Sequence, residues 1–388
     1  MKSKRVLILS ASIGTGHTQA ARAVEEYINE MPEAVEAEQV DFLSNDILSI
    51  DNIVKETYIK MIDLFPLLYD LLYHFSQGAK KGSTIQTLVS WGLKRRMQRF
   101  IREKRPDMIV FTHPFPCGAA CLLKRQGHLA IPLMGVITDF DIHQFWIYKE
   151  LDLYCVPSQQ LADRLVHHGI ERDRVHVTGI PIRRAFFKAN QYSLNTKPSG
   201  NTVLIMGGGL GLGSLQKALR RLDRVDAISR FIVVTGHNVS LYEELDQIRY
   251  KLHHPMVLYG YTNEISSLME KSTLLVTKPG ALTCTEAVAM QIPMVLFNAI
   301  PGQEEANASF WELKGCAKWA RDIGNLDDVV TALLAQPLRL QAMSAACGRW
   351  KEDSAKNITQ WILSALFCDL VAEQNLFRLT SQRSVDVK

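Results

Sequence analysis

The sequence predicts an α/β protein built from two doubly wound domains. Short apolar runs typical of buried strands alternate with longer helical stretches along the whole chain of 388 residues. The two halves share a sequence pattern, because each begins with an expected strand that is followed directly by a cluster of glycines. At a typical size of about 150 residues per domain, this length fits two domains.

The expected strands fall into two separate groups. In the first half they are residues 5–10, 36–42, 108–112, 132–138, 153–156 and 175–178, and in the second half residues 202–206, 231–235, 256–259, 274–277 and 294–297. A polar stretch rich in turn formers, residues 189–201, separates the groups. We therefore expect an N-terminal domain over residues 1–190, a linker over 191–201, a C-terminal domain over 202–360, and a helix with a tail over 361–388.

Composition excludes several classes of protein. Hydrophobic residues make up 47% and charged residues 22%, which argues against a disordered, collagen-like or coiled-coil chain. A net charge of +4, from 44 basic and 40 acidic residues, argues against a dedicated nucleic-acid binder.

The seven cysteines form no Cys-x-x-Cys pair and no zinc-type spacing, so we expect reduced, mostly buried thiols in a cytosolic protein and no metal site. No apolar run approaches the roughly 18 residues that span a bilayer. The apolar residues 6–9, which follow a basic start, are expected to be a strand and not a signal peptide. Any membrane contact is therefore expected to be peripheral.

The first glycine cluster follows the strand over residues 5–10 and ends in a histidine. Gly14 and Gly16 permit a tight turn, and a helix expected from about residue 18 to residue 30 offers free N–H groups to an anion. The spacing matches neither the dinucleotide nor the P-loop motif. His17, at the mouth of the expected cleft, suits removal of a hydroxyl proton near neutral pH. A helix-capping or solvated histidine is the alternative interpretation.

The second glycine cluster has five glycines in residues 207–213 and follows the strand over residues 202–206. Such a composition is costly in conformational entropy unless the backbone must approach a ligand closely, as a cradle for a diphosphate does. A flexible loop is the alternative.

The stretch from Lys278 to Glu286 is the most specific of the chain. Gly280 permits a turn after the strand over residues 274–277, and a helix should begin near Leu282. Glu286 then lies about one turn inside that helix, where its carboxylate can accept two hydrogen bonds from a diol such as ribose. A helix-capping carboxylate is the alternative.

The loop after the strand over residues 294–297 carries neutral and charged groups that can hold sugar hydroxyls, namely Gln303, Glu304 and Asn307. A solvated helix that begins after Pro301 is the alternative. In the first half, Asp139 follows the strand over residues 132–138 and is a candidate to orient His17 or an acceptor, or else a turn former. His113 is a further cleft candidate, although Pro114 already explains a turn there.

Two stretches of the first half could face a membrane. Apolar residues recur at helical spacing over residues 58–75, which also fits a core face. Residues 94–105 hold seven basic residues and one acidic residue, and the apolar Trp91, Met97, Phe100 and Ile101 are interleaved with this run, which suits an anionic bilayer. A solvated helix or a nucleic-acid patch is the alternative. The candidate acceptor and membrane contacts are Phe65, Tyr69, Trp91, Arg95, Arg96, Arg99, Phe100 and His113.

Together, these motifs resemble one known family. The blocks are Ser-Ile-Gly-Thr-Gly-His (12–17), Thr-Asp-Phe (138–140), Gly-Ile-Pro-Ile (179–182), Gly-Gly-Gly-Leu-Gly (207–211), Lys-Pro-Gly-Ala-Leu-Thr (278–283) and Ile-Pro-Gly-Gln-Glu (300–304). In this order, over about residues 4–357, the chain resembles the monogalactosyldiacylglycerol synthase and processive diacylglycerol glucosyltransferase family. That resemblance implies the GT-B fold, with two Rossmann-like domains facing across a cleft.

The resemblance also implies substrates and site residues. A UDP-sugar would be held mainly by the C-terminal domain, and diacylglycerol would approach through the N-terminal domain. Glycines of the second cluster would face the diphosphate, Glu286 the ribose, and Gln303 with Glu304 the sugar, while His17 would be the catalytic base. The full expected donor set is Gly16, Gly208, Gly209, Gly211, Gly280, Ala281, Leu282, Thr283, Glu286, Gln303, Glu304 and Asn307. The first glycine loop is shorter than in the family's plant members, which leaves glucose and galactose both open.

The sequence thus predicts an inverting enzyme that transfers glucose or galactose from a UDP-sugar to diacylglycerol without a metal or other cofactor. We expect it on the inner face of the cell membrane, with anionic lipids and not nucleic acid as partners. The alternatives are a UDP-N-acetylglucosamine transferase with a polyprenyl-linked acceptor, a GT-B epimerase, and a non-catalytic sensor of UDP-sugar and lipid.

Overall fold

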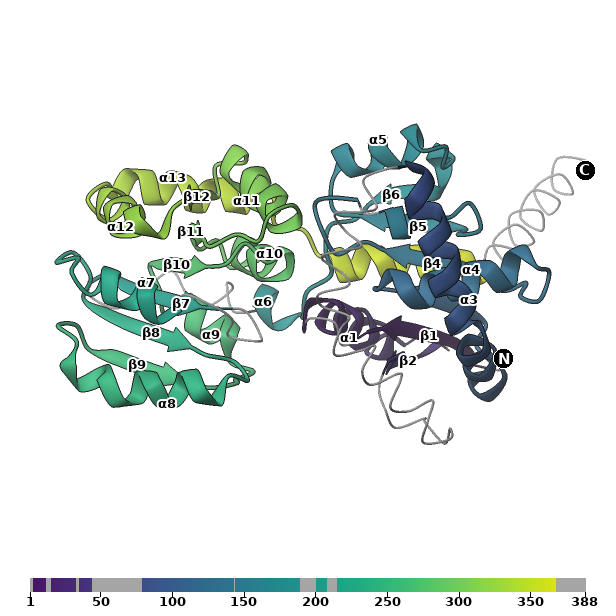
Figure 1. Cartoon of the computed structure of the whole chain (residues 1–388), viewed down its shortest axis with the longest axis horizontal. Helices are drawn as coiled ribbons and strands as arrows, with labels where there is room; N and C mark the ends of the chain where they lie inside the picture. Colours follow the sequence, from purple (N-terminus) through teal and green to yellow (C-terminus); the bar gives the residue numbers. More distant parts are fainter. Residues whose placement is uncertain are drawn as a thin grey trace, which may run out of the picture.

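The computed structural model describes residues 3–11, 15–32, 35–43, 79–142, 144–188, 200–207 and 215–367. These residues form two parallel β-sheets of six strands, each flanked by helices (Figure 1). The fold class expected from the alternation of strands and helices is confirmed.

The first sheet has the strand order β2-β1-β3-β4-β5-β6, and every neighbouring pair is parallel. Alternate residues of β1 serve opposite faces, since Leu7 and Leu9 lie in one hydrophobic cluster and Val6 and Ile8 in another. Both faces are therefore covered, as in other parallel sheets. The strands are β1 (Lys4–Ser10), β2 (Val35–Asp41), β3 (Met108–Phe111), β4 (Leu133–Val136), β5 (Leu153–Val156) and β6 (Val175–Val177).

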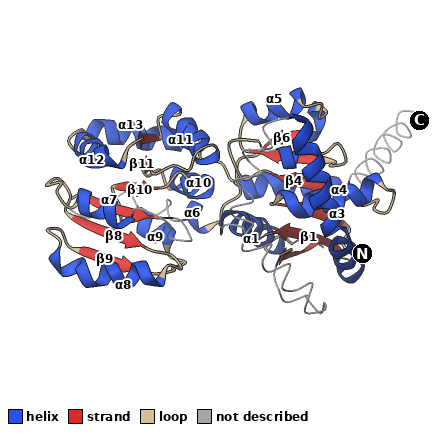
Figure 2. Cartoon of the chain, in the orientation of Figure 1, coloured by secondary structure: helices blue, strands red, loops and turns tan. Residues whose placement is uncertain are grey.

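Helices cover this sheet on both sides, as Figure 2 shows. They are α1 (Thr15–Asn29), α3 (Ala79–Lys104), α4 (Pro114–Arg125) and α5 (Gln159–His167). The short α6 (Ala185–Lys188) packs instead on the C-terminal domain, because Phe186 is buried in a cluster with Leu204 and Leu296. The face with Leu7 and Leu9 packs against α3 and α4, and the face with Val6 and Ile8 packs against α1.

The second sheet has the order β12-β11-β10-β7-β8-β9 and is also parallel. Its strands are β7 (Thr202–Met206), β8 (Arg230–Val234), β9 (Met256–Tyr259), β10 (Leu274–Thr277), β11 (Met294–Phe297) and β12 (Ala317–Ala320). Its helices are α7 (Leu215–Leu222), α8 (Val239–Ile248), α9 (Ile265–Glu270), α10 (Ala281–Ala289), α11 (Gln303–Leu313), α12 (Leu326–Leu334) and α13 (Pro337–Gly348). All five strands expected in this half are present, and β12 is the strand that the sequence analysis missed.

The last described helix, residues 354–367, returns to the N-terminal domain. Ile358 and Ile362 are fully buried in the cluster that contains Val6 and Val110 of the first sheet. Figure 1 shows this yellow segment leaving the C-terminal domain and lying against the other one. The domain boundary expected at residue 360 therefore falls inside a helix that belongs to the N-terminal core.

Helix α3 corrects one expected membrane contact. Leu93, Met97 and Phe100 lie on one stripe of the helix and are buried, and Phe100 packs against Phe42 with ring centroids 5.4 Å apart. Phe100 is thus a core residue, because the stripe faces the sheet and not the solvent. Within the residues that the structure describes, no helix is both long and apolar enough to cross a membrane.

The other face of α3 keeps its exposed and basic character. Trp91 is 70% exposed and Arg95 is exposed. Arg99 pairs with Glu103 one turn later, at 2.7 Å, and the Arg96 guanidinium lies over the Phe42 ring. Phe65 and Tyr69 lie outside the described residues.

Candidate functional site

A cavity of about 430 Å³ lies between the two domains, at the carboxyl ends of their strands. Its N-terminal wall is α1, which follows β1, and its C-terminal wall follows β7, β8 and β9 and includes α10. The two walls come close where a Cβ on Gly16 would lie 3.9 Å from the Cβ of Leu282. This is the position at which doubly wound sheets bind ligands.

His17 stands in the first turn of α1, beside this cavity. Its Nδ1 lies 2.8 Å from the backbone carbonyl of Thr112 and 2.8 Å from the hydroxyl of Thr138. A carbonyl oxygen only accepts hydrogen bonds, so Nδ1 carries the proton and Nε2 keeps its lone pair. The Thr112 hydroxyl in turn donates to the backbone carbonyl of His17 at 2.9 Å. The ends of β3 and β4 thereby fix the ring in the tautomer that a general base needs.

His113 lies behind His17 and is not an exposed acceptor contact, which corrects the sequence expectation. It is 1% exposed, and its Nδ1 accepts a hydrogen bond from the Phe115 backbone N–H as the N-cap of α4. Its ring packs edge-on against that of His17, with centroids 4.8 Å apart. Burial, and secondarily the nearby His17, hold the pKa of His113 well below its usual range, so it packs as a neutral ring.

Asp139 and Gln303 meet across the domain interface. The Gln303 side chain, at the start of α11, donates a hydrogen bond to the Asp139 carboxyl group. Burial raises the pKa of Asp139, while His17 and Gln303 oppose that rise. Two expected site residues from different domains are thus brought together next to His17.

Helix α10 carries several of the residues that the sequence predicts to bind the donor. Leu282, Thr283 and Glu286 line the cavity, and Gly280 is the N-cap, without any side-chain hydrogen bond to the first turn. Ala281, the first helical residue, is buried. The free N–H groups of this turn favour an anion.

Glu286 is 9% exposed, and its burial raises the pKa of the carboxyl to about 8, against the smaller opposing effect of Arg183. The carboxyl therefore lies in the cavity wall with little compensation for its charge. Such a group gains from a ligand that donates hydrogen bonds to it.

The polar residues of α11 differ in their burial and in their partners. Glu304 accepts a hydrogen bond from the Ile300 backbone N–H at 2.8 Å and pairs with Lys278 at 3.5 Å. Asn307 is 1% exposed, so it does not face the cavity as the sequence suggested. Its Oδ1 accepts from the Phe140 backbone N–H at 3.2 Å, and its Nδ2 donates to the Pro279 carbonyl at 3.0 Å. The Asn307 side chain thus joins the two domains.

Several cavity residues were missed by the sequence analysis. Arg22 comes from α1, Arg183 from the segment that leads out of the first sheet, His237 from the end of β8, and Tyr261 from the end of β9. The rings of His237 and Tyr261 are stacked, with centroids 4.2 Å apart. His237 and Tyr261 follow the carboxyl ends of strands, which is the signal that could have found them.

The glycines of the second cluster expected at the diphosphate, Gly208, Gly209 and Gly211, lie outside the described residues, although β7 ends beside the cavity at Met206. Across the described ranges, no group of three or more His, Cys, Asp or Glu side chains is placed to hold a metal ion.

Comparison with known proteins identifies the family. Residues 17–182 match the model of monogalactosyldiacylglycerol (MGDG) synthase, and residues 202–360 match that of the glycosyltransferase family 28 C-terminal domain. Processive diacylglycerol beta-glucosyltransferase of Bacillus cereus (strain B4264) is 30% identical over 353 residues, 89% of each chain. The protein of that name from Bacillus cytotoxicus is 30% identical over 373 residues, 94% of each chain.

Solved structures share the fold at low identity. MurG of Acinetobacter baumannii superposes with a TM-score of 0.59 at 16% identity, over 93% of this chain and 99% of that one. The S. aureus MnaA–UDP complex gives a TM-score of 0.60 at 15% identity, over 95% and 97% of the two chains. These neighbours establish the two-domain GT-B fold. With 30% identity to the Bacillus enzymes over almost its full length, the chain belongs to the monogalactosyldiacylglycerol synthase and processive diacylglycerol glucosyltransferase family.

Proposed function

We propose that this protein transfers glucose from UDP-glucose to the free hydroxyl of 1,2-diacylglycerol, with inversion at the anomeric carbon. The observation that carries the proposal is the fixed ring of His17, whose Nδ1 donates to the Thr112 carbonyl at 2.8 Å and leaves Nε2 as a base. The name of the Bacillus relatives specifies a β-glucosyl product, and UDP-glucose is an α-glycoside, so inversion follows from that product.

The proposed reaction is a single displacement. Nε2 of His17 takes the proton of the diacylglycerol hydroxyl, the oxygen bonds to the anomeric carbon, and the bond from that carbon to the diphosphate breaks. Gln303 and Glu304, near Asp139, are assigned to the sugar hydroxyls and hold the anomeric carbon in line. Asp139 is assigned to orient the acceptor and the imidazolium that forms.

The departing UDP gains negative charge, which this cavity can stabilise. The N-terminal turn of α10, the guanidinium groups of Arg22 and Arg183, and the proposed contribution of the second glycine cluster all bring positive potential. Glu286 is assigned to the ribose hydroxyls. The stacked rings of His237 and Tyr261 offer an aromatic surface for the uracil base.

Access to diacylglycerol requires contact with a membrane. We assign this contact to the outer face of α3, where Trp91 is 70% exposed next to the exposed Arg95. A basic helix with an exposed indole suits the anionic inner face of a cell membrane.

The test is to incubate the protein separately with UDP-glucose, UDP-galactose and UDP-N-acetylglucosamine, with vesicles that contain diacylglycerol or a polyprenyl-linked acceptor. Mass spectrometry identifies the products, and NMR gives the anomeric linkage. We expect UDP release and a β-linked glucosyl lipid, whose mass also reports any further sugars. A galactolipid alone would correct the donor. UDP binding without any lipid product would favour a sensor. Conversion of UDP-N-acetylglucosamine, to a polyprenyl product or to an epimer, would favour the other two alternatives.

A further inference from the structure

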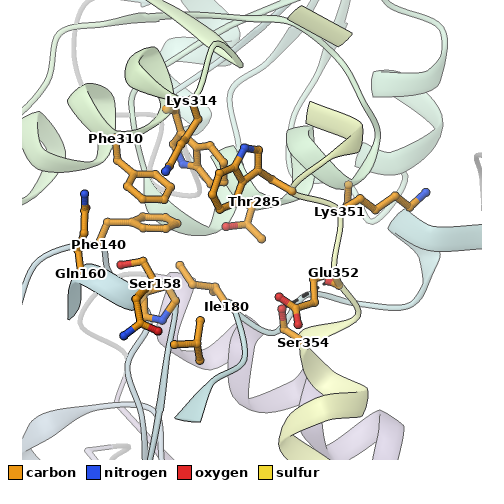
Figure 3. A pocket seen from close by; sticks show the side chains of 17 residues that line it. Phe140, Ser158, Gln160, Ile180, Thr285, Phe310, Lys314, Lys351, Glu352 and Ser354 are labelled. Atoms are coloured by element: carbon orange, nitrogen blue, oxygen red, sulfur yellow. Dashed lines mark hydrogen bonds between the residues drawn. The ribbon is translucent and has the colours of Figure 1, made fainter. Parts of the chain in front are cut away.

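A second cavity, of about 210 Å³, lies at the hinge between the domains (Figure 3). None of the described residues that line it also lines the donor cavity. Both segments that connect the domains contribute to its wall, the outgoing one through Gly179 and Ile180 and the returning one through Trp350 to Ser354. The two cavities flank α10, because Thr283 and Glu286 line one and Thr285 and Ala289 line the other.

The two connecting segments touch in this cavity. Gly179 has a positive φ of 77°, and a Cβ there would lie 2.3 Å from the Ser354 hydroxyl oxygen. Only glycine allows this approach. A ligand in the cavity therefore contacts both segments at the point where they are held together.

The walls of the hinge cavity are mostly aromatic. Phe140 of the N-terminal domain stacks on Phe310 of α11, with centroids 4.2 Å apart, and meets Trp311 edge-on at 5.1 Å. Figure 3 shows the two phenyl rings lying face to face at the edge of the space. Such walls favour an apolar chain or ring.

One cationic side chain, that of Lys314, reaches the cavity without a carboxylate partner among the described residues. The Lys314 ammonium points into the space in Figure 3 and lies over the rings of Trp350, at 4.2 Å, and Phe310, at 5.3 Å. Within the described part of the chain, no carboxylate lies within 4.0 Å of it. Trp311 is 3% exposed and contributes its ring to the wall. The Lys314 ammonium therefore supplies the positive charge of this cavity, and an anionic group is the ligand group that would pair with it.

The other charged groups of the wall lie elsewhere. The Lys351 ammonium points away from the space in Figure 3, and Glu352 lies on the opposite side from Lys314. The Glu352 carboxyl accepts a hydrogen bond from Asn357 at 2.7 Å. The cavity thus has one cationic end, at Lys314, and an apolar body.

We propose that the hinge cavity is a second ligand site, for a small amphiphile with an apolar body and a single carboxylate that accepts from Lys314. The body is an acyl chain or an aromatic ring, and either would replace the unfilled space between Phe140, Ile180 and Ala289. The ligand binds here whether or not a donor is present.

Occupancy of this site should change donor binding. Helix α10 contributes Glu286 to the donor cavity and Ala289, one turn later, to the hinge cavity, and α11 carries Gln303 at one end and Lys314 just after the other. A ligand that fixes these helices against the N-terminal domain stabilises the arrangement that binds UDP, and by linkage UDP must improve the ligand's affinity by the same factor. This coupling, unlike the binding itself, rests on the proposed function.

The first experiment measures binding of octanoate and of 3-phenylpropanoate by calorimetry, with octylammonium as the charge-reversed probe. We expect both carboxylates to bind, and octylammonium to bind at least tenfold more weakly. The carboxylate that binds more tightly shows whether the cavity prefers an acyl chain or an aromatic ring. Lys314→Gln should weaken carboxylate binding at least tenfold, and Ala289→Phe should abolish it by filling the space. The matched control Lys271→Gln changes an exposed lysine away from the cavity and should bind as the wild type does. Equal binding by Lys314→Gln and Lys271→Gln, or tighter binding of octylammonium, would overturn the proposal.

The second experiment measures the affinity for UDP with and without saturating octanoate. The coupling is supported if octanoate raises the affinity for UDP severalfold and UDP raises the affinity for octanoate by the same factor. Unchanged affinities contradict it. Octanoate that competes with diacylglycerol would instead make the cavity part of the acceptor path and overturn the assignment of a separate site. If UDP does not bind at all, the proposed function is contradicted, whereas the evidence for octanoate binding in the hinge cavity is unaffected.

Discussion

Replacement of Glu286 by glutamine should stabilise the free protein at alkaline pH and not at acidic pH. The pKa of this carboxyl rises from 4.5 to about 8 on folding, chiefly through burial. A raised acid pKa means that the folded state holds the proton more tightly than the unfolded state. Stability is therefore lost as pH rises from about 4.5 to about 8, where ionisation of the buried group must be tolerated.

The size of the effect follows from that shift. At about 1.36 kcal/mol per pKa unit, the full cost of ionised Glu286 is at most about 5 kcal/mol. Between pH 5.5 and 7.5, the free energy of unfolding of Glu286→Gln should gain about 2.7 kcal/mol on that of the wild type. The glutamine amide has its own cost of burial, but that cost does not change with pH, so the slope is the quantity to read.

Urea denaturation at several pH values, followed by both tryptophan fluorescence and circular dichroism, measures this slope. The control is Glu244→Gln, which removes an exposed carboxyl of α8 and should show no such slope. In the same pair of variants, calorimetry should show weaker UDP binding for Glu286→Gln alone, because the amide offers the ribose hydroxyls one acceptor oxygen where the carboxylate offers two. A difference in unfolding free energy that stays constant with pH would refute the reasoning about burial.

Three further substitutions separate function from stability. Gly280→Ala should leave the melting temperature unchanged, because a Cβ there meets no atom within 4 Å, yet it should weaken UDP binding severalfold in calorimetry by standing before the first turn of α10. Phe100→Ala should lower the free energy of unfolding by about 3–5 kcal/mol in urea denaturation. Trp91→Ala should change that free energy by no more than about 0.5 kcal/mol, but it should reduce co-sedimentation with anionic vesicles. Asn307→Ala should cost about 1–3 kcal/mol, since the buried Phe140 N–H loses its acceptor.

Each of these has a contrary result. Unchanged UDP affinity in Gly280→Ala would remove the diphosphate from the α10 N-terminus. Undiminished vesicle binding by Trp91→Ala would move the membrane contact to another surface. An Asn307→Ala protein as stable as the wild type would show that the contact between the domains contributes nothing to folding.

The strands were predictable because each is a short apolar run with turn formers on both sides. Strand β12 was missed because it is only four residues long and Lys318 interrupts its apolar pattern, as is common for a strand at the edge of a sheet. The burial of Phe100 was present in the sequence as the spacing of Leu93, Met97 and Phe100. The basic residues around that stripe fit a membrane-facing helix equally well, so the sequence pattern alone did not distinguish the two positions of Phe100.

Some residues of the site could be predicted from the sequence and others could not. His17 and Glu286 were identifiable, because each follows a strand and a glycine at the edge where ligands bind. The role of Asn307 was not, because its partner Phe140 lies 167 positions away and in the other domain. Arg183 was likewise hidden, since its position in the cavity depends on the path of a segment between two sheets. Local patterns predict local structure, and contacts between domains require the folded chain.

The central claim is that His17 is the base, and His17→Asn tests it most directly. The asparagine amide can still donate to the Thr112 carbonyl, so the fold and the donor cavity should be preserved, but no basic nitrogen remains. We predict that turnover of UDP-glucose with diacylglycerol falls by about 10²–10⁴-fold, while UDP affinity stays within about twofold of the wild type. His128→Asn, on the surface, should keep full turnover. Near-normal turnover by His17→Asn would contradict the account.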